Sequence, residues 1–196
     1  MTSADLVAAL QPIAETFERL GVRYYVGGSV ASSARGVPRA SIDVDMAAEL
    51  RPEHVGPFVA ALQDQYYVTE ERVREAVAAR RSFNAIHLAT MMKVDVFVSR
   101  GRPFDRSAFE RLTPEVLDAA SPARGYPIPR AEDVVLLKLE WFRAGGEASD
   151  RQWGDVVGVI RVAAGTLDRS YLARWAPELG VSDLLDRALA AAEAAG

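Results

Sequence analysis

Two aspartates separated by one residue, Asp43 and Asp45, are the starting point for any chemistry in this sequence. They lie in the segment SIDVDM, whose alternation is typical of a β-strand. Both carboxylates should therefore project from one face, and Ile42, Val44 and Met46 from the other. Two carboxylates held that close repel each other unless a cation lies between them. A hard ion such as Mg²⁺ (or Mn²⁺) fits, because it takes one or two carboxylates and completes its shell with phosphate oxygens and water.

A third aspartate, Asp95, lies in the apolar strand segment KVDVFV, where a buried carboxylate without a partner would be costly. If this strand pairs beside SIDVDM, Asp95 completes a three-carboxylate site suited to phosphoryl chemistry. Asp95 could then also take the proton from the attacking hydroxyl. The structural alternative is that the first two aspartates are solvated on an edge strand, while Asp95 forms a salt bridge with Lys93 or an arginine.

A glycine-rich turn, Gly27-Gly28-Ser29, follows a strand expected at residues 22–26 and precedes a short small-residue helix. Glycines let the backbone approach a phosphate closely, and Ser29 can donate both its hydroxyl and its amide. A helix N-terminus at this point favours an anion as well. The turn is neither a Walker A loop nor a nucleophile elbow, because it lacks the residues that define those motifs.

Lys138 lies on the expected helix EDVVLLKLEWFRA, on the same apolar stripe as Val134, Val135, Trp141 and Phe142. A lysine placed there needs an anion at its tip, and a triphosphate is one candidate. The alternatives are that Lys138 snorkels to the surface or pairs with a core carboxylate. Arg39, just before the metal strand, is a second candidate for phosphate, with a plain surface role as its alternative.

Arg151 and Asp155 lie on a further expected helix, which opens with an S-x-x-Q capping box at Ser149 and Gln152. For Asp155 we expect a structural salt bridge with a cation. An arginine-rich helix at residues 70–81 is mostly a solvated face, and it is the best candidate for RNA contact if RNA is the acceptor.

The order of expected elements is strand, helix, strand, two helices, two strands and then a helical tail, after an N-terminal helix. This order predicts an α/β (α+β) fold, with a mixed β-sheet flanked by helices. We expect a core over residues 1–125 and a helical C-terminal subdomain over residues 126–196, packed on that core. The Gly-, Pro- and Arg-rich stretch at 101–130 is expected to be a connector.

Composition sets wide limits on function. The chain has 196 residues, 49% of them hydrophobic, and a formal net charge of −4, which argues against a generic polyanion binder. It contains no cysteine, so disulfides and thiolate metal sites are excluded. The first ten residues lack the features of a secretory signal, and no apolar run approaches the roughly 18 residues of a membrane helix. We therefore expect a cytoplasmic protein with no membrane association.

Taken together, these residues resemble the minimal nucleotidyltransferase superfamily, which has the DNA polymerase β-like fold. The resemblance rests on YVGGS, Arg39, the Asp43-Val44-Asp45 strand and Asp95. The segments PRAEDVVLLKLEW and DRQWGDV are most similar to AbiEii-type toxin nucleotidyltransferases, although Gln152 stands where those toxins often have an aspartate.

The resemblance implies a role for each matching residue. Asp43, Asp45 and Asp95 would be metal ligands and catalytic carboxylates. Gly27, Gly28, Ser29 and Arg39 would bind the nucleotide, Lys138 would serve both binding and catalysis, and Arg151 and Asp155 would support the site.

The predicted function is magnesium-dependent transfer of a nucleoside monophosphate from an NTP to an acceptor hydroxyl. The acceptor could be an RNA 3′ end, a protein side chain or a small molecule. An RNA acceptor would suit the toxin of a toxin–antitoxin pair, with an antitoxin protein as partner. The alternative is a non-catalytic nucleotide-binding or interaction module of the same fold. A metal-dependent phosphohydrolase is disfavoured, because no histidine clusters with the aspartates.

Overall fold

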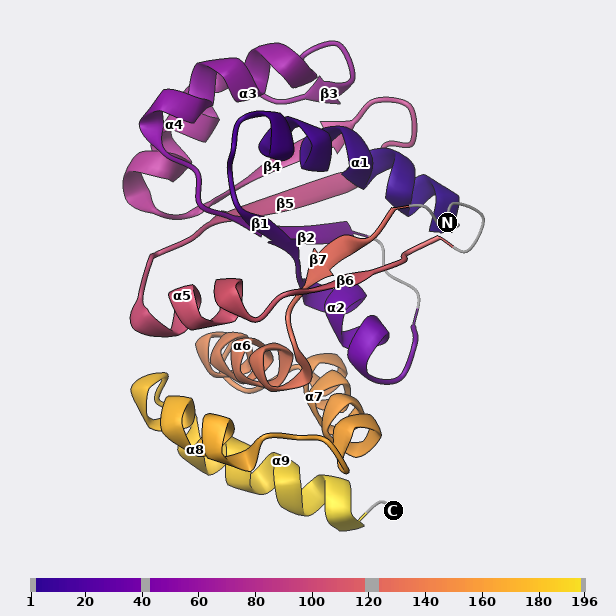
Figure 1. Cartoon of the computed structure of the whole chain (residues 1–196), viewed down its shortest axis with the longest axis vertical. Coiled ribbons are helices and arrows are strands. Elements are labelled where there is room, and N and C mark those ends of the chain that lie inside the picture. The colour runs from indigo at the N-terminus through magenta and orange to yellow at the C-terminus, as the bar shows by residue number, and fades with distance from the viewer. Residues whose placement is uncertain (1–2, 40–42, 119–123, 195–196) are drawn as a thin grey trace. The chain divides into compact units, whose positions relative to one another are not determined.

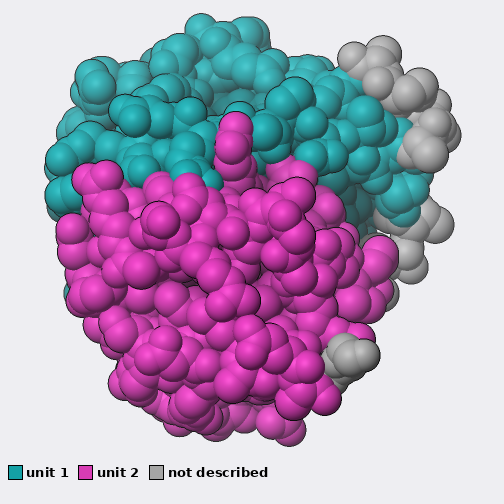
Figure 2. Space-filling model, turned by 60° about the horizontal axis from the view of Figure 1, so that its bottom comes forward, with its two compact units in different colours: residues 1–27, 40–128 teal, residues 28–39, 129–196 magenta. Residues whose placement is uncertain are grey.

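The computed structural model describes residues 3–39, 43–118 and 124–194. It divides into two compact units, coloured separately in Figure 2: unit 1 is residues 1–27 and 40–128, and unit 2 is residues 28–39 and 129–196. The division expected from the sequence, 1–125 and 126–196, placed residues 28–39 in the first part. In the structure they group with the C-terminal helices. Ile42, expected on the apolar face of the aspartate strand, lies outside the described residues.

Unit 1 is built on a mixed sheet, as the sequence predicted. Its described strands are β1 (Tyr24–Val26), β2 (Asp43–Ala48), β3 (Tyr66–Tyr67), β4 (Ser82–His87) and β5 (Lys93–Val98), in the five-stranded order β1-β2-β5-β4-β3. Strands β2 and β5 run parallel, and the other neighbours are antiparallel. The two strands that carry aspartates therefore lie side by side in the sheet.

One face of this sheet is covered by helices. The helical segments on this side of the sheet are α1 (Ser3–Arg19), η1 (Pro52–His54), α3 (Val55–Leu62) and α4 (Glu70–Ala79). Figure 1 shows α1, α3 and α4 together on one side of the strands. Phe58 on α3 meets Phe83 of β4 edge-on and stacks on Phe17 of α1, with ring centroids 5.8 and 5.1 Å apart. Burial of this apolar face supplies the main driving force for folding unit 1. The aspartates are left on the opposite face.

The opposite face carries elements that the sequence did not predict. Helix α5 (Pro103–Glu110) places Phe109 against Tyr25 of β1, with ring centroids 5.0 Å apart. Strands β6 (Thr113–Glu115) and β7 (Tyr126–Ile128) form a small antiparallel pair. The Gly, Pro and Arg residues that suggested an irregular connector instead lie within and between these short elements. The pairing of the strands depends on tertiary contacts that local sequence does not encode.

Unit 2 is helical in its described part. It contains α2 (Gly28–Arg35), α6 (Ala131–Ala144), α7 (Asp150–Ala163), α8 (Arg169–Glu178) and α9 (Ser182–Ala194), and α2 packs against α6 and α7. The approach is close after the end of α2, because a Cβ at Gly36 would lie 2.9 Å from the backbone nitrogen of Val159. The Ser149 hydroxyl accepts a hydrogen bond from the Gln152 backbone N–H at 3.3 Å and caps α7, which is one half of the predicted capping box. Within the described ranges, no helix has the length and apolarity needed to cross a membrane.

Candidate active site

The three aspartates of the sequence motif lie on one face of two neighbouring strands in unit 1. In the parallel pairing of β2 with β5, Asp45 lies opposite Asp95, and Asp43 lies opposite Lys93. The intervening Val44 and Val94 are fully buried on the other face. Strand alternation therefore positions the carboxylates, and core burial fixes the register, because a slip of one residue would turn the valines away from the core.

Lys93 supplies a positive charge among these carboxylates. Its Nζ lies 2.6 Å from an Asp95 oxygen and 3.9 Å from an Asp43 oxygen. The hydrogen bond to Asp95 raises the pKa of Lys93, with further upward contributions from the charges of Asp95, Asp43 and Asp45 that outweigh partial desolvation. The Lys93–Asp95 salt bridge of the structural alternative is thus observed. Its edge strand is not, because β2 lies between β1 and β5.

The donor set suits a hard divalent cation, although the side chains are not arranged around one. Among the residues that the structure describes, no group of three or more His, Cys, Asp or Glu side chains could hold a metal ion. Asp43 and Asp95 nevertheless both reach one cation, the Lys93 ammonium, and Asp45 contributes to its electrostatic field. Oxygen ligands of this kind match Mg²⁺ or Mn²⁺.

The glycine turn lies where β1 ends. The Gly27 amide donates a hydrogen bond to the Asp45 carbonyl at 2.8 Å, which ties the turn to the aspartate strand within unit 1. Gly28 has a φ of 53°, a left-handed conformation that favours glycine, and it opens α2. Ser29 follows in the first turn of that helix, in unit 2, where backbone amides have no intrahelical acceptor.

Unit 2 contains a second charged cluster, centred on Asp155 of α7. Arg39 donates to both oxygens of Asp155 at 2.8 Å, and the Lys138 Nζ donates to one of them at 2.8 Å. Burial alone would raise the pKa of Asp155. The hydrogen bonds and charges of Arg39 and Lys138 outweigh that effect and hold the pKa below its usual value.

These contacts account for two residues that the sequence proposed for the nucleotide. The expectation of a structural salt bridge at Asp155 is met, and Lys138 is bound to a buried carboxylate, as its alternative stated. Arg39 makes the bidentate contact with Asp155, whereas Arg151 is exposed on α7. The roles of Arg39, Lys138 and Arg151 toward a nucleotide remain predictions.

Lys93 was underrated by the sequence argument, which treated it only as a salt-bridge partner. The signal that could have identified it is its spacing, two residues before Asp95 in an alternating strand. That spacing alone places its side chain on the face that carries the carboxylates.

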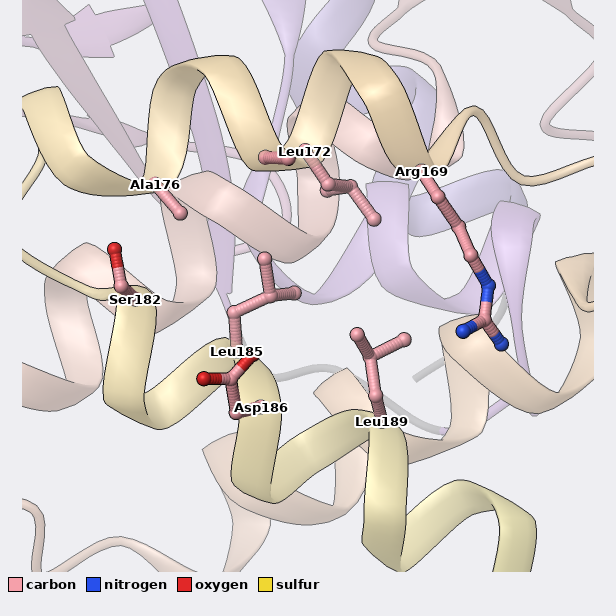
Figure 3. Close-up of a pocket in the computed structure, with 8 residues that line it drawn as sticks. Arg169, Leu172, Ala176, Ser182, Leu185, Asp186 and Leu189 are labelled. Atoms are coloured by element: carbon pink, nitrogen blue, oxygen red, sulfur yellow. The ribbon is translucent and has the colours of Figure 1, made fainter.

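Unit 2 also has a groove, which is lined by none of the residues of these charged clusters. It runs between α8 and α9 with a volume of about 340 Å³, and Figure 3 shows Leu172, Leu185 and Leu189 lining it, with Arg169 and Asp186 beside them. None of the residues predicted for catalysis or nucleotide binding lines it. We therefore place the candidate chemistry at the carboxylate strands.

Comparison with known proteins gives a fold likeness. No protein-family model and no curated protein matches the sequence. The solution structure of the antibiotic-resistance factor ANT(2'')-Ia matches with a TM-score of 0.55 at 14% identity, over 98% of this chain and 97% of that one. An antigenic nucleotidyltransferase-like protein from Paracoccidioides brasiliensis matches with a TM-score of 0.57 at 12% identity, over 96% and 94%.

A third match is a structure with a bound antibiotic. The lincosamide antibiotic adenylyltransferase LnuA, bound to lincomycin, gives a TM-score of 0.50 at 15% identity, over 83% of this chain and 98% of that one. At such low identities the likeness concerns the fold alone. The chain has the mixed α/β fold of known nucleotidyltransferases.

Proposed function

We propose that this protein is a divalent-metal-dependent nucleotidyltransferase, which moves a nucleoside monophosphate from an NTP to an acceptor hydroxyl and releases pyrophosphate. One observation carries the proposal: Asp45 and Asp95 lie in register on neighbouring parallel strands, with Asp43 on the same face, in a fold shared with nucleotidyltransferases. A purely structural sheet has no need for three carboxylates on one face of two neighbouring strands.

The roles follow from position and chemistry. Asp43, Asp45 and Asp95 would hold Mg²⁺ or Mn²⁺, which when bound supplies charge stabilisation for the triphosphate. Asp95 would accept the proton of the attacking hydroxyl. Ser29 and the first amides of α2 would bind phosphate, and Gly27 and Gly28 allow that approach.

The remaining cations have supporting roles. We propose that Lys138 and Arg39 contribute positive charge toward the nucleotide and that Asp155 holds both cations in place. Their mutual contacts at 2.8 Å support this positioning role, because they fix two otherwise flexible side chains. Arg151 is exposed on the same helix as Asp155, and its proposed supporting role rests on the sequence resemblance alone.

For the acceptor, a small hydroxylated molecule is the best-supported choice. A structure of ANT(2'')-Ia contains adenylyl-2''-tobramycin, and the LnuA structure contains lincomycin. The net charge of −4 also favours a small acceptor over indiscriminate nucleic-acid binding. An RNA 3′ end, with the protein acting as a toxin beside an antitoxin partner, is the acceptor implied by the AbiEii-type resemblance. A protein side chain is the third candidate acceptor.

One observation favours the alternative of a non-catalytic module. Lys93 already neutralises Asp95 at 2.6 Å, so the carboxylates are stable without a metal. A module of this kind would bind nucleotide without transferring any part of it.

The test uses each of the four NTPs labelled at the α-phosphate, with Mg²⁺ and three acceptor classes: aminoglycosides and lincosamides, total RNA, and protein extract. Asp45→Asn is the site variant. Asp64→Asn is the matched control, because it makes the same change at an exposed position of unit 1. Transfer by the parent and by Asp64→Asn, reduced at least about a hundredfold in Asp45→Asn, supports the enzyme and names the acceptor.

Two other outcomes separate the alternatives. Magnesium-dependent NTP binding without transfer to any acceptor would favour the non-catalytic module. Absence of magnesium-dependent NTP binding would overturn the metal-site proposal itself.

A further inference from the structure

Lysine is rare in this chain, and its positions are informative. Of 23 basic residues, 21 are arginines and two are lysines, Lys93 and Lys138. Both lysines form ion pairs with aspartates: Lys93 with Asp95, and Lys138 with Asp155. The chain has arginine at all 21 other basic positions and lysine only at the two carboxylate clusters.

The chemistry of the two cations explains why position 93 suits lysine. A guanidinium is planar and forms paired hydrogen bonds in a fixed geometry, whereas an ammonium is a compact charge on a flexible stem. Lys93 holds Asp95 with a single short contact and reaches Asp43 at 3.9 Å from the same position. An ammonium can therefore neutralise two carboxylates and still leave them by rotating its stem.

Exposure allows that rotation. The side chains of Lys93 and Asp43 are 46% and 44% exposed, so Lys93 can swing into solvent without breaking a packed core. Lys138 is 11% exposed, and its partner Asp155 is 6% exposed. Of the two lysines, Lys93 is the one whose position permits exchange of partners.

The same carboxylates cannot serve Lys93 and a divalent cation at once. A doubly charged ion among Asp43, Asp45 and Asp95 would repel an ammonium 2.6 Å from an Asp95 oxygen. The ammonium must then move away from Asp95, and a phosphate of a bound nucleotide offers it a new anion.

We propose that Lys93 is an exchangeable counter-ion. In the nucleotide-free protein it neutralises Asp43 and Asp95, and when the metal and nucleotide bind it leaves Asp95 and contacts the triphosphate. This inference rests on the proposed function. It predicts that Lys93 weakens metal binding in the absence of nucleotide and strengthens it in its presence.

The affinity of the protein for Mn²⁺, measured by electron paramagnetic resonance of the free ion, tests both predicted effects of Lys93, without nucleotide and with it. The measurement needs no turnover. In Lys93→Gln, Mn²⁺ should bind about three- to tenfold more tightly than in the parent when nucleotide is absent. With a non-hydrolysable α,β-methylene NTP present, the variant should bind about three- to tenfold more weakly, because a phosphate contact is lost. Lys93→Arg keeps the charge and should show a smaller change in both conditions.

Arg74→Gln is the matched control, because it removes a positive charge from unit 1 at a residue that pairs with Glu70 on α4. It should leave both Mn²⁺ affinities within about twofold of the parent.

Nuclear magnetic resonance supplies a second measurement on the parent protein. Selective ¹³C labelling of the lysine ε-carbons gives signals from two residues, and Lys93→Gln identifies the signal of Lys93. Addition of Mg²⁺ alone should shift the Lys93 signal and leave the Lys138 signal in place.

The outcomes distinguish the two proposals. If the parent binds Mn²⁺ with the nucleotide analogue, but Lys93→Gln has unchanged affinity in both conditions, the counter-ion proposal is overturned and the nucleotidyltransferase proposal stands. Weaker Mn²⁺ binding by Lys93→Gln without nucleotide also overturns it, because Lys93 would then organise the carboxylates. If the parent binds no metal–nucleotide complex, the proposed function fails first.

Discussion

The two lysine–aspartate pairs of this protein have the same chemical components and different surroundings. In unit 1, Lys93 and Asp95 lie on a sheet face, with side chains 46% and 19% exposed. In unit 2, Lys138 and Asp155 are 11% and 6% exposed, and Arg39 adds a bidentate contact to the same carboxylate. Water screens the first pair far better than the second.

This difference implies different uses for one kind of ion pair. An ion pair with one half-exposed partner contributes little free energy, and that partner can be exchanged at small cost. A buried carboxylate held by two cations is costly to break, because the remaining charges cannot be solvated. We therefore assign the unit 1 pair to ligand exchange and the unit 2 cluster to rigid positioning.

The largest effect should follow removal of Asp155. Asp155→Ala leaves Arg39 and Lys138 without their shared carboxylate, and we expect the free energy of unfolding to fall by about 3 kcal/mol. Urea denaturation followed by circular dichroism measures this, with Asp64→Asn as a control that should be close to neutral. A loss below about 1 kcal/mol would contradict the contrast between the two pairs.

The pH dependence of the same site should be visible in acid. Because the pKa of Asp155 lies below its ordinary 3.8 in the folded protein, the charged cluster stabilises the fold above that pH. The stabilisation is lost as the pH falls below 3.8 and through the folded-state pKa. The difference in unfolding free energy between the parent and Asp155→Asn should therefore shrink between pH 5 and pH 3 in urea titrations, and a growing difference would refute the assignment.

A much smaller effect is expected at the unit 1 pair. Asp95→Ala should change the free energy of unfolding by less than about 1 kcal/mol, because Lys93 is half-exposed and still has Asp43 within 4 Å. Thermal and urea unfolding should agree on this. A loss as large as that of Asp155→Ala would show that Asp95 has a structural role and would weaken the case for exchange.

The smallest effect sets the baseline for a surface ion pair. Glu70→Gln removes the partner of Arg74 on α4, where both side chains are more than half exposed. We expect a change within about 0.5 kcal/mol. If Asp95→Ala and Glu70→Gln prove indistinguishable in stability, the unit 1 pair behaves as an ordinary surface contact.

The sequence identified the parts of the site that depend on local pattern. Alternation in SIDVDM and KVDVFV was enough to place Asp43, Asp45 and Asp95 on one face, because strand period and core burial act together. It could not choose among partners: Lys93 and the arginines were both candidates for Asp95, and the cation expected at Asp155 could not be named. Those choices depend on contacts between segments far apart in the chain.

The missed elements have a related cause. Strand β3 comprises Tyr66–Tyr67 and exists because it pairs with β4, so its own residues carry little signal. Helix α5 lies in a stretch whose Gly and Pro content suggested a connector, although Pro103 stands at the start of the helix, where proline is favoured. The grouping of α2 with the C-terminal helices is a matter of tertiary packing, for which the sequence offered no periodic pattern.

The place of α2 in the chain has a consequence for synthesis on the ribosome. Arg35 donates a hydrogen bond to the Pro129 carbonyl, 94 residues later, and Gly36 packs against Val159. At typical translation rates of about 5–20 residues per second, the segment 28–39 waits at least roughly 5–20 s for these partners to emerge. During that interval the nascent chain exposes a helix surface that its own C-terminal part will cover. Translation speed and chaperone access should therefore influence the yield of unit 2 more than that of unit 1.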